Sequence, residues 1–316
     1  MFSFSTLGRQ LLAGVTGLLA PVVTLASAHA AQVDTSGFNV DPALYVLEAD
    51  DHKVYLFGTF HVLPSDLAWN TDKVASAFLE ADTLILEADA YSPQAQASMQ
   101  PLIGQLGLDG SGTPLAERLS AEARTDLAAL ASTLGVPAEA LEASINPMRP
   151  WLASVILGVG YITSQGFDPN SGVDQYFFTQ ASTSGSHAML FFETAEQQLN
   201  FFANIPDEVS LAALEASLDE MATNPAMLND LLKAWAEGDM DTLDQLVLES
   251  MSGGDEIIYE TLIASRNYAW VESIETMIDE TPGGVTFIAV GAAHLPGEQG
   301  VVELLRNAGF GVEEVE

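Results

Sequence analysis

Two short motifs of the form G-x-x-H each place a histidine just after an apolar run. One is Gly58-Thr-Phe-His61 and the other is Gly291-Ala-Ala-His294, and a proline-containing loop follows each of them. The apolar runs that precede them have the length and composition of buried strands. Strands of an α/β sheet present side chains to a crevice where they end. If the two strands are neighbours, His61 and His294 converge on one site.

A third apolar run ends on a carboxylate, because Leu84-Ile85-Leu86 is followed by Glu87. A buried carboxylate needs a cation or hydrogen-bond donors. Two imidazoles with a divalent metal ion would meet that need, and His and carboxylates are the metal ligands left to a chain with no cysteine. The alternative is that each histidine is a hydrogen-bonded structural residue and that Glu87 pairs or caps.

The composition excludes several classes of function. The chain has 316 residues, with 44 Asp and Glu against 9 Lys and Arg, and its formal net charge is −35. Nucleic-acid binding needs clustered cations, so it is excluded, and an anionic membrane surface is disfavoured for the same reason. With 48% hydrophobic residues, the chain can bury a sizeable core. The acidic surface is typical of proteins kept soluble in high salt, and it could instead steer cationic substrates.

Residues 1–30 have the pattern of a secretory signal peptide. An apolar run from Leu11 to Ser27 leads to the small-x-small sequence Ala-His-Ala that ends at Ala30. We expect cleavage near Ala30, which leaves 31–316 as a single periplasmic or secreted domain with no stable membrane insertion. The alternative is an uncleaved membrane anchor, because the apolar run approaches the length of a membrane span.

Strand-rich ends enclose a helical middle. Strands are expected at 43–48, 54–58, 83–87, 188–192, 285–290 and 311–315, with a polar turn at 49–52 between the first two. Helices are expected around 74–79, over 120–141 with a break at 135–137, and at 151–162, 173–181, 207–279 and 299–307. This order predicts an α/β (α+β) fold, with a central mixed sheet flanked by helices and a large helical insert over roughly 95–280.

Seven short segments run in a characteristic order along the mature chain. They are Phe57–His61, Leu86–Glu87, Pro150–Leu152, Ser171–Asp174, Glu193–Gln198, Arg266–Trp270 and Val290–Gly297. In this combination the chain resembles the TraB/GumN family, which includes the PrgY and Tiki proteins. The resemblance implies a fold related to erythromycin esterase and ChaN-like proteins. It also implies a peptide or protein substrate, since Tiki members are divalent-metal-dependent proteases and PrgY members reduce peptide-pheromone activity.

The resemblance also implies roles for particular residues. His61, Glu87 and His294 match the positions expected to hold a divalent ion, which would be Mn, Co or Zn. Glu193 is then implied as the general base, and Arg266 as the group that steadies the developing charge.

Alternatives remain open for these residues and for others of the same segments. Glu193 could instead be an acid at a helix start, and Arg266 could form a buried structural ion pair. Asp174 and Gln198 are weaker candidates for the site. The remaining histidines of the mature chain, His52 and His187, are expected to face solvent.

Three hypotheses about function follow. The first is a metal-dependent hydrolase that cleaves peptide bonds. The alternative is a non-catalytic binding protein of the envelope that sequesters a peptide or haem. The third is a degenerate, structural protein that would tolerate loss of His61 or His294. No H-E-x-x-H or G-x-S-x-G sequence occurs, so a zincin-type protease is excluded and a serine triad is unsupported.

Overall fold

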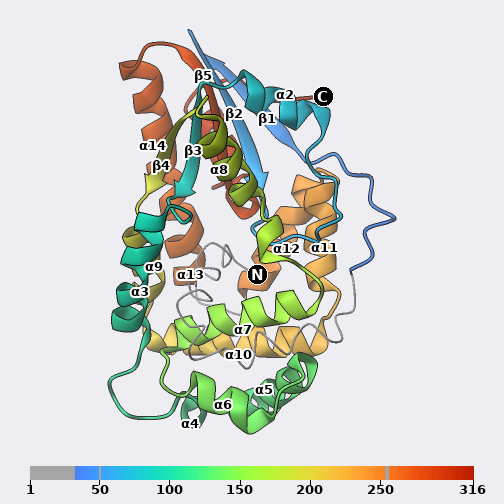
Figure 1. The fold of residues 1–316 in the computed structure, drawn as a ribbon, viewed down its shortest axis with the longest axis vertical. Helices are drawn as coiled ribbons and strands as arrows, with labels where there is room; N and C mark the ends of the chain where they lie inside the picture. Colours follow the sequence, from blue (N-terminus) through green and yellow to red (C-terminus); the bar gives the residue numbers. More distant parts are fainter. Residues whose placement is uncertain (1–32, 50, 253–255) are drawn as a thin grey trace.

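The computed structural model describes residues 33–49, 51–252 and 256–316. Residues 1–30, for which we predict a signal peptide, lie outside the described part of the chain. Within that part, six strands form one mixed sheet in the order β4-β3-β5-β2-β1-β6 (Figure 1). The strands are β1 Leu44–Ala49, β2 His52–Thr59, β3 Thr83–Ala88, β4 Ala188–Glu193, β5 Gly284–Gly291 and β6 Val312–Glu314.

Helices fill the connections between these strands. They are α2 Asp72–Glu80, α3 Pro93–Gly107, α4 Leu115–Arg118, α5 Ala121–Leu134, α6 Ala138–Ile145, α7 Pro150–Ser164, η2 Pro169–Ser171, α8 Val173–Ser184, α9 Ala195–Asn204, α10 Asp207–Thr223, α11 Met227–Ala236, α12 Met240–Ser252, α13 Glu256–Tyr259, η3 Glu260–Ala264, α14 Ser265–Glu280, η4 Ala292–His294 and α15 Val301–Asn307. The predicted mixed sheet flanked by helices is confirmed. β4 divides the predicted helical insert into two parts, α3 to α8 and α9 to α14.

The sheet has a parallel centre and an antiparallel side. β2 pairs with β5, β5 with β3, and β3 with β4, all in parallel. β1 pairs antiparallel with β2 and with β6. In this register Thr59 lies opposite Gly291, and Ala88 lies opposite Glu193. The carboxyl ends of the four parallel strands therefore meet at one edge of the sheet.

Each face of the sheet has its own hydrophobic core. Along β5, Phe287 and Ala289 belong to one core, and Ile288 and Val290 belong to the other. This alternation follows from the two-residue period of a strand. Helices α2 and α8 pack on the first face. Helices α14 and α15 cover the second, where Trp270 is among the buried residues.

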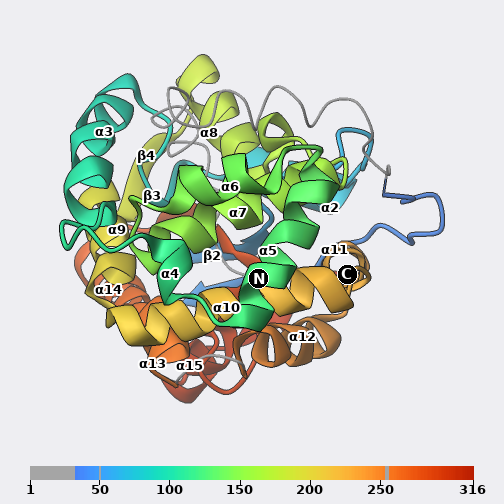
Figure 2. The same cartoon turned by 90° about the horizontal axis from the view of Figure 1, so that it is seen from below.

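A second helical layer lies beyond the carboxyl edge of the parallel strands (Figure 1). Helices α5, α7 and α10 pack against one another there (Figure 2). The helix expected at 151–162 is α7, and most of its residues are buried. The carboxyl ends of the parallel strands therefore face a layer of helices.

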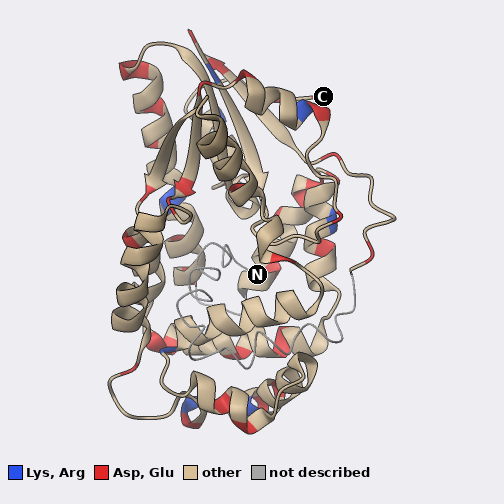
Figure 3. Cartoon of the chain, in the orientation of Figure 1, with Lys and Arg blue, Asp and Glu red and all other residues tan. Residues whose placement is uncertain are grey.

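Asp and Glu greatly outnumber Lys and Arg and are spread over many elements of the described chain. Figure 3 shows Asp and Glu on the sheet connections and on the helical layer, with few Lys or Arg among them. No described helix has both the length and the apolar character needed to cross a membrane.

One of the two histidines that we expected to face solvent is buried, and the other is partly exposed. His52 is the first residue of β2, paired with Ala49, and it is buried with its Nε2 3.2 Å from the Thr281 carbonyl oxygen. The strands extend further than the predicted turn allowed, so His52 points inward. His187 is only partly exposed, because its ring stacks on Phe78 at a centroid distance of 4.2 Å.

Candidate functional site

Four parallel strands end at one edge of the sheet, and each delivers a residue to the same site. His61 lies two residues after β2, and His294 ends the short helix η4 that follows β5. Glu87 is the penultimate residue of β3, and Glu193 is the last residue of β4. All four side chains are buried. The strand-end residues that the sequence singled out are therefore gathered at one place.

The glycine of the first motif lets the two G-x-x-H segments approach each other. A Cβ added at Gly58 would lie 3.0 Å from the Cα of Ala292, in the middle of the second motif. A larger residue would push β2 away from the loop that carries His294. Trp235 of α11 also holds this point, because its indole N–H donates to the Gly58 carbonyl at 2.8 Å.

Arg266 of α14 lies at the centre of the cluster. Its Nε and Nη2 donate to the two carboxylate oxygens of Glu193 at 2.7 and 2.9 Å. Nη2 also donates to Oε2 of Glu87 at 2.8 Å. Nη1 donates to the Leu262 carbonyl at 3.0 Å and lies 3.1 Å from Nε2 of His294. One buried cation thus joins both carboxylates and one imidazole.

An irregular stretch of helix precedes this arginine. The segment Glu260–Ala264 is π-helical and leads directly into α14. Single π turns recur at functional sites. Four residues apart on α14, Arg266 and Trp270 share a face. The Trp270 ring centre lies 4.7 Å from the guanidinium carbon, and its indole N–H donates to Glu193 at 3.0 Å.

The two carboxylates have different environments. Burial alone would raise the pKa of Glu87, but the charge of Arg266 and the nearby histidines lower it to about 2. The Gly291 N–H donates to Glu87 at 2.5 Å, and the Gln198 amide donates to it at 3.1 Å. Burial raises the pKa of Glu193, and Arg266 offsets this only in part. Glu87 is therefore firmly ionised, whereas Glu193 takes up a proton more readily.

His294 is a neutral imidazole in a defined tautomer. Burial, followed by the charge of Arg266, lowers its pKa to about 3. The Asn267 Nδ2 donates to the carbonyl oxygens of His294 and Gln299, so its Oδ1 faces Nδ1 of His294 at 2.6 Å. An amide oxygen only accepts, so the ring proton is on Nδ1. Nε2 then accepts from the guanidinium of Arg266.

His61 has the opposite environment. Its Nδ1 hydrogen-bonds to Oδ2 of Asp174, and the Thr59 hydroxyl donates to Oδ1 of the same carboxylate at 2.8 Å. Burial lowers the pKa of His61, but the charge of Asp174 and this hydrogen bond outweigh burial and raise it. The charges of Glu87 and Arg266 also act on the ring. A histidine oriented in this way by a carboxylate has the form of a general base.

Residues that were weaker candidates, or had no assigned role, complete the cluster. Asp174 orients His61, and Gln198 donates to Glu87. Asn267 fixes the tautomer of His294, and Trp270 bonds to Glu193. The signal that could have found Trp270 is its position four residues after Arg266 on one face of a predicted helix, whereas the helical period gives no such signal for Asn267, the next residue after Arg266.

The structure also decides between alternatives for two residues. Thr194 caps α9, because its hydroxyl accepts from the Gln197 N–H at 3.2 Å while the Gln197 side chain accepts from the Thr194 N–H. Glu193 is therefore not the N-cap itself: it lies one residue before the cap, at the start of the helix, and its carboxylate is bound to Arg266. Arg266 does form a buried ion pair, as one alternative predicted. Its action on a reacting group stays a prediction.

A divalent ion held by His61, Glu87 and His294 also stays a prediction, and the present arrangement does not fit one. Both oxygens of Glu87 accept protein hydrogen bonds, and Nε2 of His294 accepts from Arg266. The guanidinium stands among the proposed ligands, and its charge opposes a second cation. Across the described residues, no three His, Asp or Glu side chains are arranged to hold a metal ion.

Comparison with known proteins identifies the family. The model of the TraB/PrgY/gumN family matches residues 43–314, from the start of β1 to the last strand. The chain belongs to this family. Every site residue lies within the matched region, so the whole cluster is part of the TraB/PrgY/gumN domain. The implied relation to erythromycin esterase and ChaN-like proteins stays a prediction.

Similar proteins occur in Escherichia coli and in Treponema pallidum. The uncharacterized protein YbaP of Escherichia coli K12 is 25% identical over 265 residues, which cover 84% of this chain and 92% of YbaP. An uncharacterized protein of Treponema pallidum is 27% identical over 268 residues, covering 80% of this chain and 77% of its own. The likeness thus extends over nearly the whole domain in each case, and neither relative has an assigned activity.

Proposed function

We propose that this TraB/PrgY/gumN protein hydrolyses amide bonds in a peptide or protein substrate at the strand-end site. The observation that supports this most is that like groups are driven apart in pKa. The pKa of His61 is raised, whereas that of His294 is lowered to about 3. Likewise, the pKa of Glu193 is raised, whereas that of Glu87 is lowered to about 2. In each pair, one group exchanges a proton near neutral pH and the other keeps a fixed protonation state.

His61 is the base in this proposal. Its Nδ1 is held by Asp174, so Nε2 is the ring atom that takes a proton from water. The water oxygen attacks the carbonyl carbon, and a tetrahedral oxyanion forms. When the C–N bond breaks, the protonated His61 returns that proton to the leaving amine. The acyl half leaves as a carboxylic acid, so all atoms of the water are accounted for.

Arg266 supplies the positive charge for the oxyanion. Its five N–H groups already donate to Glu193, Glu87, the Leu262 carbonyl and His294, so in this proposal Arg266 acts on the oxyanion through its fixed charge and not through a free N–H. Both oxygens of Glu193 accept from Arg266, so we assign Glu193 to positioning rather than to the role of base predicted from the sequence. His294 shares this positioning role, because its Nε2 accepts from Nη1 of Arg266.

The test is cleavage of a defined peptide mixture by the purified mature chain, followed by mass spectrometry. We expect turnover by the wild type and a loss of about 10²–10⁴-fold in kcat/KM for His61→Ala. His187→Ala removes a histidine from outside the cluster and is the matched control, with activity near that of the wild type. A fully active His61→Ala variant would contradict the proposal.

A chelator arm separates this mechanism from the metal-dependent one. We expect EDTA to leave the activity unchanged. Loss of activity in EDTA, with recovery on adding Mn²⁺, Co²⁺ or Zn²⁺, would restore the predicted metal site at His61, Glu87 and His294. The ion would then act by lowering the pKa of bound water.

A binding protein without turnover is the second candidate. It is favoured by the observation that Glu87, Glu193 and Arg266 satisfy one another within the cluster. Peptide binding with no cleavage in either arm would support it, and a Soret band on adding haem would support the haem form.

We further propose export of the protein, because residues 1–30 have the pattern of a signal peptide. Mass spectrometry of the mature N-terminus checks cleavage near Ala30.

A further inference from the structure

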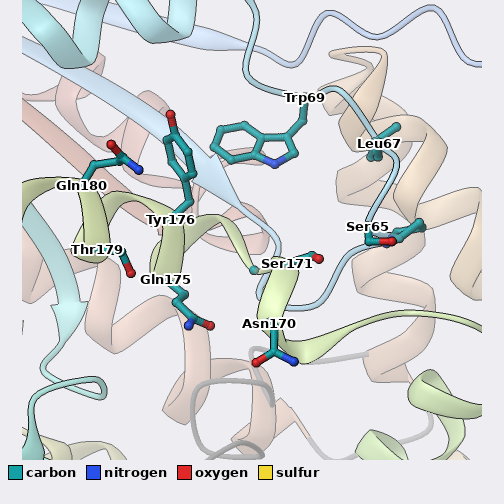
Figure 4. Close-up of a pocket in the computed structure, with 11 residues that line it drawn as sticks. Ser65, Leu67, Trp69, Asn170, Ser171, Gln175, Tyr176, Thr179 and Gln180 are labelled. Atoms are coloured by element: carbon teal, nitrogen blue, oxygen red, sulfur yellow. The ribbon is translucent and has the colours of Figure 1, made fainter. Parts of the chain in front are cut away.

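A cavity of about 390 Å³ lies beside the loop that carries His61, within the size range of ligand pockets. One wall is the chain after His61, from Pro64 to Trp69, and the other is η2 with the first turns of α8 (Figure 4). In Figure 4 the side chains of Tyr176 and Trp69 lie at one end of the cavity and that of Asn170 at the other. This cavity is separate from the charged cluster, because it shares no side chain with it.

Both walls are fastened to the backbone around His61. The Val173 N–H donates to the Phe60 carbonyl at 2.9 Å, and the Asp168 N–H donates to the Leu63 carbonyl at 2.9 Å. On α8, Asp174 binds the His61 ring, while its neighbour Gln175 lines the cavity. A ligand in the cavity would therefore contact both segments that position His61, the proposed base.

The lining indicates what kind of ligand fits. Its polar side chains are amides and hydroxyls, from Ser65, Asn170, Ser171, Gln175, Thr179 and Gln180, and the lining contains no Asp, Glu, Lys, Arg or His. The Gln175 side chain also lines the cavity, and its buried Oε1 has no hydrogen-bond partner within the described chain. A ligand that bears N–H and C=O groups would match these amides and hydroxyls.

The aromatic end of the cavity favours a peptide over a sugar. Trp69 is only 7% exposed, because its ring packs on Phe57 at 6.0 Å and edge-on against Tyr176 at 5.2 Å. A sugar would need an open indole face on which to stack, and this one is covered by protein. Amide side chains pair naturally with backbone N–H and C=O groups.

We propose that this cavity is a secondary binding site for an uncharged, extended segment of the peptide substrate. This inference rests on the proposed function, because it takes the ligand to be the substrate. It adds the place where a part of the substrate remote from the cleaved bond is held. Binding energy from such a stretch can be used to orient the bond that reacts.

The test is binding of N-acetyl-trialanine amide to the full-length protein, followed by ligand-observed NMR. Thr179→Trp fills the cavity from an exposed helix position, and we expect it to weaken binding by about tenfold or more. Thr125→Trp, on the exposed face of α5, is the matched control and should bind as the wild type does. Gln175→Leu removes a polar side chain from the lining and should also weaken binding, while the midpoint of unfolding does not fall, because a buried acceptor without a partner lowers stability.

The outcomes separate this inference from the proposed function. The same spectra report cleavage of the peptide, so binding and hydrolysis are read independently. Binding that Thr179→Trp abolishes supports the cavity site even if no peptide is cut. Equal binding by the wild type and Thr179→Trp, no binding by the wild type, or Thr179-dependent binding of maltotriose in place of the peptide would each overturn it.

Discussion

Arg266 sets the protonation of the groups around it. Its charge lowers the pKa of Glu87 and His294 and restrains that of Glu193. The guanidinium is 5% exposed, so these interactions are little screened by solvent. A single arginine therefore carries out the charge neutralisation that the sequence pattern led us to assign to a metal ion.

Removing this charge should destabilise the fold. Arg266→Met leaves two buried carboxylates without their cation, and we expect a loss of about 3–5 kcal/mol in the free energy of unfolding. Urea unfolding followed by circular dichroism at neutral pH measures it. Arg124→Met is the control, because the Arg124 guanidinium donates a long hydrogen bond of 3.4 Å to the Ala116 carbonyl, and we expect a change within about 0.5 kcal/mol. Equal stability of the two variants would contradict the account of Arg266.

The sequence predicted the residues of the site better than their contacts. A histidine or glutamate at the end of an apolar run must lie at a sheet edge, which is why His61, Glu87 and His294 could be placed from pattern alone. Arg266 comes from a helix, and its direction depends on a π-helical stretch with no sequence signature that we identified. The link between Asp174 and His61 joins segments far apart in the sequence, so spacing could not predict it.

At the scale of elements, the packing of α8 against the loop that carries His61 depends on one close contact. A Cβ added at Gly172 would lie 2.1 Å from the carbonyl oxygen of His61, which is backbone and cannot rotate away. Gly172 also precedes Asp174, so a shift of α8 would move the carboxylate that orients His61. The glycine therefore allows the helix to approach the histidine closely enough for that hydrogen bond.

Gly172→Ala should destabilise the protein by about 1–3 kcal/mol, because the added methyl group forces backbone apart. It should also lower kcat more than it changes KM, since the base is displaced. Gly158→Ala, within α7, is the matched control: nothing lies within 4 Å of its added Cβ, and we expect a gain of about 0.5–1 kcal/mol from helix propensity. Thermal unfolding of both variants checks this. A Gly172→Ala variant as stable as the wild type would show that the loop moves freely.

Elements were predictable where they carry a strong local period. The strand over 285–290 and the helix over 299–307 have apolar patterns that tertiary contacts do not override, and β5 and α15 form there. The turn between the first strands was predicted too long, because β1 and β2 remain paired as far as Ala49 and His52. Polar residues in a short hairpin do not reveal how far the ladder extends.

At the scale of the whole molecule, the order of the strands could not be read from the sequence. β2 and β5 lie side by side although nearly the whole helical part of the chain separates them. Their pairing depends on how α2, α8, α14 and α15 cover the two faces, which is a property of the assembled core. A mixed sheet was predictable from the succession of patterns, whereas the central position of β5 was not.

The strongly negative charge also frames how stability changes with pH. Self-repulsion among surface carboxylates weakens as pH falls, which favours the compact state. The buried site acts in the opposite direction through His294, whose pKa is about 3 in the folded protein against 6.5 when exposed. The unfolded chain therefore binds this proton first. The stability that His294 contributes is fully present above pH 6.5 and is lost as pH falls toward 3.

Comparison with His294→Asn isolates this effect, because surface repulsion is common to both proteins and cancels in the difference. The Asn side chain can still donate to Asn267, but it cannot become charged. In buffer with EDTA, we expect the wild type to lose about 2 kcal/mol relative to the variant between pH 7 and pH 5, which follows from about 1.4 kcal/mol per unit below 6.5. Urea unfolding at each pH measures the gap. A gap that stays constant or moves the other way would mean that His294 is protonated when folded, and the guanidinium of Arg266 could then not donate to its Nε2.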